Sequence, residues 1–320
     1  GDRCGEPAMK TTVKPGFICL WTVLLLTVWA ADVLAADGAF EERLSLDGPI
    51  LLDVDTGSGR IEIRPGPGNE AFIRGEIRVN KRGFWGGRGG SKDEIVQAVM
   101  DNPPIELKDG RLRVGRFDDR GLGRRVSISY EITVPANSEV FADSGSGSIS
   151  VVNITAPVEA SAGSGSITLE NIGGAVDAST GSGSIRADGV AGAFKGSTGS
   201  GSIEMSQTAP GDVKVSTGSG STSLTGVIGA LRANAGSGRI TVEGRMAGDW
   251  DLDTGSGSVR VTLPADAAFD IEAESNSGSI DIDHPLTVQG RISERRITGE
   301  VRGGGPRLKI DTGSGGVRVL

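Results

Sequence analysis

Residues 176–203 read VDASTGSGSIRADGVAGAFKGSTGSGSI, and in this stretch a Thr-Gly-Ser-Gly-Ser-Ile unit recurs after 18 residues, at 180–185 and at 198–203. Before each unit, apolar and polar residues alternate, as in Val176-Asp177-Ala178-Ser179-Thr180. A period of two is typical of a strand with one buried face. A fixed repeat of two short strands joined by a Gly-Ser turn predicts a β-solenoid, in which each repeat forms one rung of a stack.

The repeat can be followed through the chain by the first glycine of the turn. Between Gly145 and Gly255 the steps are 18, 18, 18, 19, 18 and 19 residues. Asn276 occupies the same slot in one further repeat. The glycine recurs at Gly57, Gly145, Gly163, Gly181, Gly199, Gly218, Gly236, Gly255 and Gly313. Rungs of nearly equal length would place equivalent residues of successive repeats on top of one another.

Three apolar columns accompany this glycine, one five residues before it and two at four and six residues after it. The first is Leu52, Val140, Val158, Val176, Phe194, Val213, Leu231, Trp250, Ile271 and Leu308. The second is Ile149, Ile167, Ile185, Ile203, Ile240, Val259, Ile280 and Val317, and the third is Val151, Leu169, Met205, Leu224, Val242, Val261, Ile282 and Val319. Thr222 and Ala187 are the weak members. Stacking would bury these columns in a core that no single rung can form, which makes burial the main stabilising term.

The turns are expected to reverse the chain because glycine reaches positive φ without a Cβ penalty. Their Thr and Ser hydroxyls also recur in columns, for example at Thr180, Thr198 and Thr217. We interpret these as ladders that satisfy one another and the turn backbone. A hydroxyl array that organises sugars, water or ice is the alternative.

A decorated N-terminal part interrupts the repeat, because Gly57 and Gly145 are 88 residues apart. Between Pro65 and Pro135, strands are expected at 71–79, 105–108, 112–114 and 126–134 and a short helix at 93–100. This part should cover the open end of the solenoid, where unpaired strand edges invite association. The predicted fold is thus all-β, a single-chain β-solenoid with a capped N-terminus. Its predicted parts are a signal segment with upstream residues at 1–35, a β-rich start with a capping insertion at 36–139, and the repeat domain at 140–320.

The first 35 residues have the pattern of a secretory signal. Met9-Lys10 and Lys14 form a positive region, residues 17–30 an apolar run and Val33-Leu34-Ala35 a small-residue cleavage site. The run is shorter than the ~20 residues of a spanning helix, although retention as an anchor is the alternative. We therefore predict an exported protein, resident in the periplasm or at the cell surface or beyond, that is not integral to a membrane after cleavage.

The composition restricts the class of partner. The formal net charge is −8, and residues 1–35 contribute three basic and three acidic groups, so the remaining chain also carries −8. An acidic chain disfavours general binding to nucleic acid. Both cysteines, Cys4 and Cys19, fall in the predicted signal part, and one histidine, His284, follows it. This excludes Cys/His zinc sites from the mature chain, and no cofactor is expected.

A candidate contact site for a ligand lies in the N-terminal part, within Lys81-Arg82-Gly83-Phe84-Trp85-Gly86-Gly87-Arg88. Aromatic and cationic side chains alternate with glycine there. We interpret Lys81, Arg82, Phe84, Trp85 and Arg88 as possible contacts to a polysaccharide, a lipid headgroup or an envelope protein. The alternative is a hairpin tip whose Trp packs on the body.

The sequence resembles the bacterial putative-adhesin family of β-strand-repeat proteins, a domain of unknown function. The similar segments are the strand ending in Pro135 (residues 128–135), the Thr-Gly-Ser-Gly-Ser-Ile units, and Gly303-Gly304-Gly305-Pro306 leading into residues 308–315. The resemblance covers about residues 40–320. It implies a β-solenoid and an adhesin-like role, and it brings no catalytic residues.

Two functions remain open from the residues. A non-catalytic envelope or surface scaffold is favoured, because His284 next to Pro285 is expected to lie on the surface and Gly-Ser-Gly is not a nucleophile elbow. The alternative is a carbohydrate-active enzyme, a polysaccharide hydrolase or lyase with paired carboxylates. Acidic residues recur two before the turn glycine at Asp55, Asp143, Asp253 and Asp311. We interpret these repeated residues as structural, bonding nearby backbone amides, and expect no catalytic or metal-binding residues.

Overall fold

The computed structural model describes residues 36–79, 91–117, 120–123, 125–288, 293 and 295–320, and Ala36–Leu320 form one compact unit. The described residues form helices α1 (Lys92–Asp101) and α2 (Arg120–Gly123) and the strands β1 (Gly38–Ser45), β2 (Leu51–Thr56), β3 (Ile61–Pro65), β4 (Glu70–Val79), β5 (Ile105–Lys108), β6 (Arg111–Val114), β7 (Val126–Val134), β8 (Glu139–Ser144), β9 (Ile149–Val152), β10 (Val158–Ala162), β11 (Ile167–Glu170), β12 (Val176–Thr180), β13 (Ile185–Val190), β14 (Phe194–Thr198), β15 (Ile203–Gln207), β16 (Val213–Thr217), β17 (Thr222–Ala235), β18 (Ile240–Thr254), β19 (Val259–Thr262), β20 (Phe269–Ser275), β21 (Ile280–Ile282), β22 (Leu286–Val288), β23 (Arg296–Val301), β24 (Arg307–Thr312) and β25 (Val317–Val319). The fold is the predicted β-solenoid.

Each rung consists of a strand before the Gly-Ser turn and a strand after it. Strands before the turn pair in parallel as one row, and strands after it as a second row; β12 pairs with β10 and β14, whereas β13 pairs with β11 and β15. We call these the first row and the second row. Pairing is in register, so Val176 lies beside Phe194 and Ile185 beside Ile203. Strands β17 and β18 are long because each supplies both rows.

The core lies between the two rows. Alternate residues of β12 are buried, as the period of two predicts. All members of the three apolar columns are buried except Ile280 and Ile282, which are half-buried in β21 at the last rung. The weak members Thr222 and Ala187 are also buried. The sequence pattern therefore identified the core rung by rung.

A ladder of hydroxyl groups joins most turns to the neighbouring rung of the stack. The Thr180 hydroxyl donates to the carbonyl oxygen of Gly165 (2.8 Å) and accepts from the Gly183 amide (3.2 Å). Thr198 repeats both contacts one rung later, with the Gly183 carbonyl and the Gly201 amide. The same paired contacts recur at Ser144, Thr217, Thr254, Ser275 and Thr312. Thr56 also accepts from its turn amide, at Gly59, but donates to the carbonyl oxygen of Ile128. The hydroxyls satisfy the turn backbone, as expected, and Ala162 and Ala235 are buried in the same slot without a hydroxyl.

The glycines of these turns are needed for a different reason from the one expected. Their φ angles are not in the left-handed region. Instead, a Cβ on Gly183 would overlap the carbonyl oxygen of Gly165 in the rung before it. Left-handed residues occur at the opposite corner of the rung, at Asn153 (φ 56°) and Asn171 (φ 54°). Close rung-to-rung approach, rather than positive φ, therefore dictates glycine in the turn.

At both ends the outermost rung is formed by an interior segment of the described chain. The rung of β2 and β3 lies between β6–β7 and β8–β9. Likewise, the rung of β24 and β25 lies between β18–β19 and β20–β21. Both inserted rungs are thus hydrogen-bonded on two sides.

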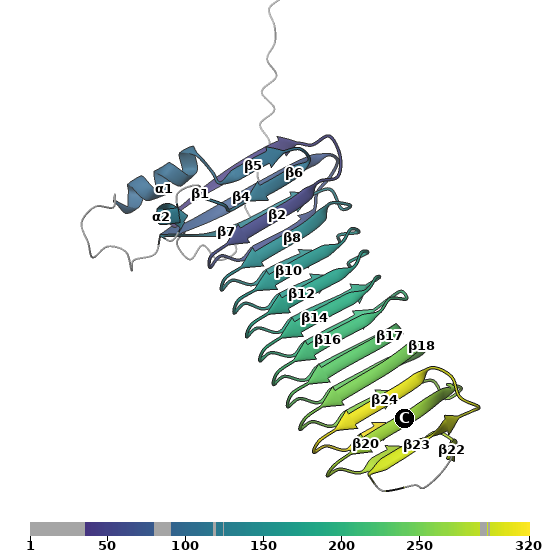
Figure 1. Ribbon diagram of the computed structural model, residues 1–320. Coiled ribbons are helices and arrows are strands. Elements are labelled where there is room, and N and C mark those ends of the chain that lie inside the picture. Colours follow the sequence, from purple (N-terminus) through teal and green to yellow (C-terminus); the bar gives the residue numbers. More distant parts are fainter. Residues whose placement is uncertain (1–35, 80–90, 118–119, 124, 289–292, 294) are drawn as a thin grey trace, which may run out of the picture. The chain divides into compact units, whose positions relative to one another are not determined.

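Antiparallel strands cap the stack. At the N-terminal end β4 pairs with β7 and β1, and α1 packs on β1 and β4 (Figure 1). At the other end β23 pairs with β20 and β22. The expected strands and helix of the N-terminal insertion are confirmed, and they cap the solenoid as predicted. The division at residue 139 stays a prediction.

His284 was expected on the surface, and that expectation is wrong. Its side chain is buried and packs edge-on against Phe269, with ring centroids 5.5 Å apart. The segment after β21 folds back over the last rung, which buries the ring.

The hydroxyl ladder yields a test by Thr198→Val, which keeps the side-chain shape and removes the hydroxyl. The change leaves the Gly183 carbonyl and the Gly201 amide without a partner, so we expect a loss of about 1–3 kcal/mol in the free energy of unfolding. Urea denaturation measures the loss. Ser200→Ala, in the exposed part of the same turn, is the control and should stay within about 0.5 kcal/mol of the parent. Equal effects of the two changes would contradict the ladder.

Candidate functional site

The predicted contact residues Lys81, Arg82, Phe84, Trp85 and Arg88 lie outside the described residues. Their assignment to a ligand-contact site therefore stays a prediction. Within the part of the chain that the structure describes, a groove lies elsewhere, on the first row of strands.

This groove, of about 700 Å³, runs across successive strands of the first row, from β8 to β24. Each rung contributes up to three consecutive positions: the residue before the buried apolar column, the column residue and the outward residue after it. The residues before the column are small in four rungs, namely Pro157, Ala175, Ala193 and Ala230. The remaining lining residues are Glu139, Val140, Phe141, Val158, Glu159, Val176, Asp177, Phe194, Lys195, Asp212, Val213, Lys214, Leu231, Arg232, Asp249, Asp251 and Arg307. In these rungs a small side chain precedes the apolar column and a longer, outward side chain follows it. Because the rungs are of nearly equal length, the small positions line up and produce a continuous groove.

The outward residues of the groove, as far as Asp251, form one column in register, and Lys309 continues that column beyond the groove. Pairing of neighbouring strands places them in the order Phe141, Glu159, Asp177, Lys195, Lys214, Arg232, Asp251 and Lys309. Neighbouring strands are roughly 4.8 Å apart, so one side chain is presented per step of that length. Three cations therefore lie side by side, between acids at both ends.

Two of the three cations are neutralised by these acids. Lys195 Nζ lies 2.6 Å from Asp177 Oδ2, and Arg232 Nη2 lies 3.1 Å from Asp251 Oδ2. The hydrogen bond to Asp177 and its charge raise the pKa of Lys195. In contrast, no carboxylate among the described residues lies within ion-pair distance of Lys214, which is exposed.

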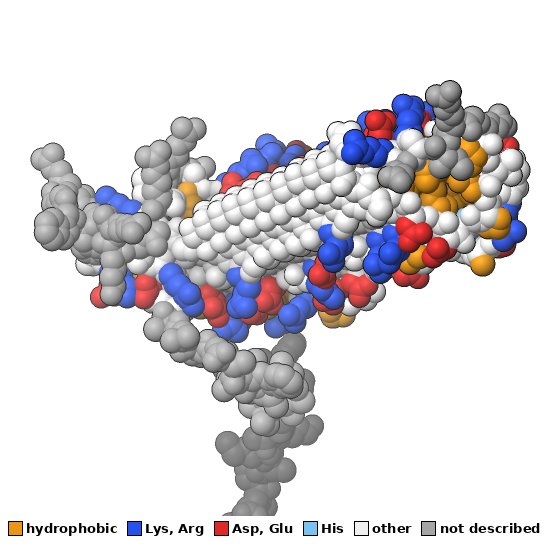
Figure 2. Space-filling model, turned by 90° about the horizontal axis from the view of Figure 1, so that it is seen from below, with side chains coloured by type: hydrophobic (Ala, Val, Ile, Leu, Met, Phe, Trp, Pro, Cys, Tyr) orange, Lys and Arg blue, Asp and Glu red, His pale blue; other side chains and the backbone are white. Residues whose placement is uncertain are grey.

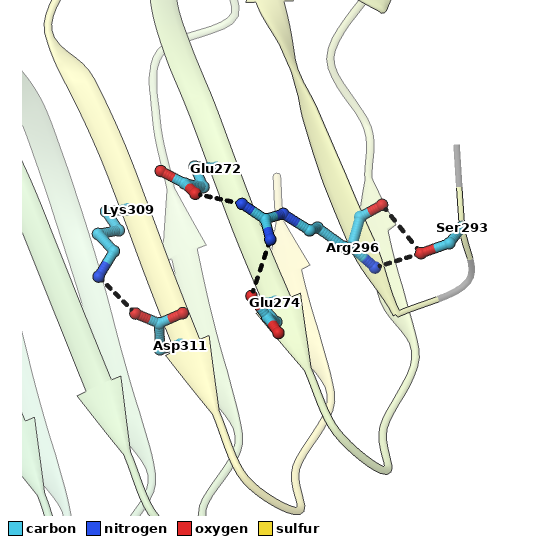
Figure 3. Close-up of polar contacts among 6 residues, drawn as sticks. All are labelled: Glu272, Glu274, Ser293, Arg296, Lys309 and Asp311. Atoms are coloured by element: carbon cyan, nitrogen blue, oxygen red, sulfur yellow. Dashed lines mark hydrogen bonds and ion pairs between the residues drawn. The ribbon is translucent and has the colours of Figure 1, made fainter. Parts of the chain in front are cut away.

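At the C-terminal end of the row, cations are paired throughout the cluster drawn in Figure 3. The Arg296 guanidinium reaches Glu272 Oε1 (2.9 Å) and Glu274 Oε2 (3.7 Å). Lys309 Nζ lies 2.7 Å from Asp311 Oδ2, and that contact raises the pKa of Lys309. The backbone of Arg296 is fixed by Ser293, whose hydroxyl accepts from its amide at 2.9 Å. These side chains are occupied with one another, unlike Lys214.

The turn side of the stack presents mainly glycine and serine. Seen from below, a strip that is neither charged nor hydrophobic runs along the stack, with charged side chains lined up beside it (Figure 2). The outer glycines and serines of the turns, such as Gly199 and Ser200, are exposed. The turn threonines point inward, so this strip offers fewer hydroxyls than the sequence pattern suggests.

A second concavity, of about 480 Å³, lies at the turn of the N-terminal rungs. Its lining includes Asp55, Arg116, Phe117 and Tyr130. Tyr130 occupies the isoleucine column beside Ile61, and its buried hydroxyl has no hydrogen-bond partner among the described residues. Burial, and then the charge of Asp55, raise the pKa of Tyr130. Burial and the neighbouring Asp143 raise the pKa of Asp55 against the effect of Arg116.

The four recurring Asp residues do not play the role expected for them. The turn amides are bonded by the Thr and Ser hydroxyls, and within the described ranges no hydrogen bond from a backbone amide to Asp55, Asp143, Asp253 or Asp311 is formed. Asp55 and Asp143 are instead neighbours in register on β2 and β8. Across the described residues, no group of three or more Asp, Glu, His or Cys side chains is placed to hold a metal ion.

Comparison with known proteins places the chain in a family. The family model described as Toastrack DUF4097 matches residues 122–320, well over half of the chain. This confirms the resemblance drawn from the sequence, although the match begins at residue 122 rather than near residue 40. No curated protein matches the sequence.

Two solved structures are similar. A putative cell adhesion protein from Clostridium sporogenes is 11% identical, with a TM-score of 0.22, and the alignment covers 88% of this chain and 98% of that one. A putative adhesin from Bacteroides fragilis is 10% identical, with a TM-score of 0.33, and the alignment covers 88% and 97%. In the described part of the chain, no helix is both long and apolar enough to cross a membrane.

The raised pKa of Asp55 predicts a pH-dependent effect of Asp55→Asn. As pH rises above about 3.9, the ordinary value for Asp, the unfolded chain loses this proton before the folded one, so ionisation of Asp55 costs folding stability. We therefore expect Asp55→Asn to be more stable than the parent at pH 7, with the difference disappearing near pH 3. Thermal unfolding across this range measures it. Asp253→Asn, exposed in the same column, is the control, and a destabilised Asp55→Asn at pH 7 would contradict the assignment.

Proposed function

This chain belongs to the Toastrack DUF4097 family, and we propose that it is an exported, non-catalytic scaffold of the cell envelope or surface that binds an elongated partner along the groove of the first row. The observation that carries the proposal is the continuity of the groove over the rungs from β8 to β24. A partner that lies across the rungs meets one outward side chain at each strand. Candidate partners are a polysaccharide, a lipid headgroup or an envelope protein.

The rigidity of the stack supports a binding role. The strands that carry the groove are hydrogen-bonded on both sides, as β14 is to β12 and β16. Side chains on such strands are held in place before a ligand arrives, which reduces the entropy lost on binding. Export is supported by the signal-like pattern of residues 1–35.

The direct test blocks the groove without touching the core. Ala193 is exposed on the groove floor, so Ala193→Trp fills the furrow. We expect ligands detected for residues 36–320 on a glycan and lipid-headgroup array to bind this variant at least about tenfold more weakly, a change of roughly 1.4 kcal/mol.

Ser223→Trp, exposed on the second row, is the matched control and should leave binding unchanged. Binding that survives Ala193→Trp but is lost on changing Phe84 and Trp85 to Ala would move the site to residues 81–88. No binding on the array would contradict a glycan or lipid scaffold.

Asp55 and Asp143 favour one alternative, a carbohydrate-active enzyme that uses paired carboxylates. The two are neighbours in register, and one has the raised pKa that a general acid needs. If the protein is a non-catalytic scaffold, its incubation with the polysaccharides that it binds on the array releases no reducing ends. Release that is abolished by both Asp55→Asn and Asp143→Asn would establish the enzyme instead.

A further inference from the structure

We propose that the groove binds a linear polysaccharide in which a carboxylate-bearing sugar is flanked by neutral sugars, and that the carboxylate contacts Lys195, Lys214 and Arg232. This inference rests on the proposed function and names the class of ligand for the same groove. It is carried by the order of charges in the outward column.

The cationic triplet is electrostatically unfavourable in the free protein. Lys214 lies in register with Lys195 on one side and Arg232 on the other. Like charges directly opposite one another on neighbouring strands repel. The chain has a net charge of −8, so acids to offset Lys214 are abundant in the sequence. The acidic residues nearest to Lys214 in the sequence have other partners.

Asp212 is near Lys214 in the chain but does not form an ion pair with it. It lies two residues before Lys214 on the same side of the groove, yet its carboxylate accepts a hydrogen bond from the Ala230 amide at 3.1 Å. Asp249 similarly accepts from the Arg307 amide at 2.8 Å. With Asp177 and Asp251 paired to the outer two cations, an anion from outside would complete the pairing at the centre.

The pattern limits how many anions fit. The triplet spans roughly 10 Å, two strand spacings, before acids follow at Asp177 and Asp251. A chain with a carboxylate on every residue would meet these acids and be repelled. Carboxylates instead accept hydrogen bonds from sugar hydroxyls, so neutral sugars on either side of one acidic sugar fit this order of charges.

An aromatic side chain at the N-terminal end of the groove favours a glycan. Phe141 is half-buried and points outward in the column where the neighbouring β10 has Glu159. An apolar ring on a polar face offers a platform for the apolar side of a sugar ring. A peptide is disfavoured because binding by strand addition needs a free edge, and the strands lining the groove are paired on both sides. A flat anionic membrane is disfavoured as well, because it would contact the acidic Glu159 and Asp177 together with the cations.

The experiment uses residues 36–320 and the trisaccharide N-acetylglucosamine–glucuronate–N-acetylglucosamine, in which one carboxylated sugar lies between two neutral sugars, together with its carboxyl-reduced, uncharged form. We expect the acidic form to bind at least about tenfold more tightly, with an affinity that falls as salt rises. Lys214→Ala should remove this preference by weakening the acidic form about tenfold while leaving the reduced form within about twofold. Phe141→Ala should weaken both forms.

Arg260→Ala, on the second row, is the matched control and should change neither affinity. Thermal unfolding of Lys214→Ala should occur at the parent's midpoint or slightly above it, because the side chain is exposed and its loss relieves repulsion from Lys195 and Arg232. Equal affinity for the two sugars, or an unchanged preference in Lys214→Ala, would overturn the inference. So would tighter binding of a poly-glutamate peptide or of phosphatidylglycerol vesicles than of the acidic trisaccharide.

The outcome also separates this inference from the proposed function. Loss of reduced-sugar binding in Ala193→Trp, together with no effect of Lys214→Ala, would leave the groove as the binding site and reject the acidic ligand. Binding of both sugars that is unchanged in Ala193→Trp and in Lys214→Ala would reject the groove itself.

Discussion

The contact between the Gly-Ser turns of successive rungs sets the geometry of this protein. A turn threonine such as Thr180 binds the amide of its own turn and the glycine carbonyl of the rung before it. That carbonyl occupies the space that a side chain on Gly183 would need. The rungs can approach to hydrogen-bonding distance only where this position is glycine. Hydroxyl and glycine therefore act as one unit, and the regular recurrence of the unit fixes the register of the apolar columns on both sides of it.

Register also determines which side chains the surface presents side by side. With rungs of 18 or 19 residues, the residue after the buried column falls in the same place each time, so a sequence repeat becomes a line of side chains. The buried apolar columns tolerate little variation, since they must pack. The outward residues can carry a charge of either sign. Phe141, Lys195, Lys214 and Arg232 are such outward residues, and their order across the strands is the basis of the ligand proposed for the groove.

Much of the fold could be predicted from the sequence, because the period of two and the period of 18 act locally. The columns and the insertion strands follow these patterns, and the helix at 93–100 was also expected from the sequence. Three features were not. The insertion of the rung of β24 and β25 between β18–β19 and β20–β21 depends on pairing between distant segments, and residues 307–319 look like any other repeat. Burial of His284 depends on the chain folding back over Phe269. The groove depends on small residues such as Ala193 falling into register, and the equal slots of Lys195, Lys214 and Arg232 were the signal that could have indicated it.

The most direct test of this account is the unfolding of Gly183→Ala beside Gly57→Ala. Both change a turn glycine, but a Cβ at Gly57 meets nothing, whereas at Gly183 it meets the preceding rung. If close approach of the rungs determines the fold, Gly183→Ala loses about 1–3 kcal/mol or more in urea and Gly57→Ala is close to neutral. Equal behaviour of the two variants would mean that the glycines serve the turn conformation alone, and would contradict the central claim.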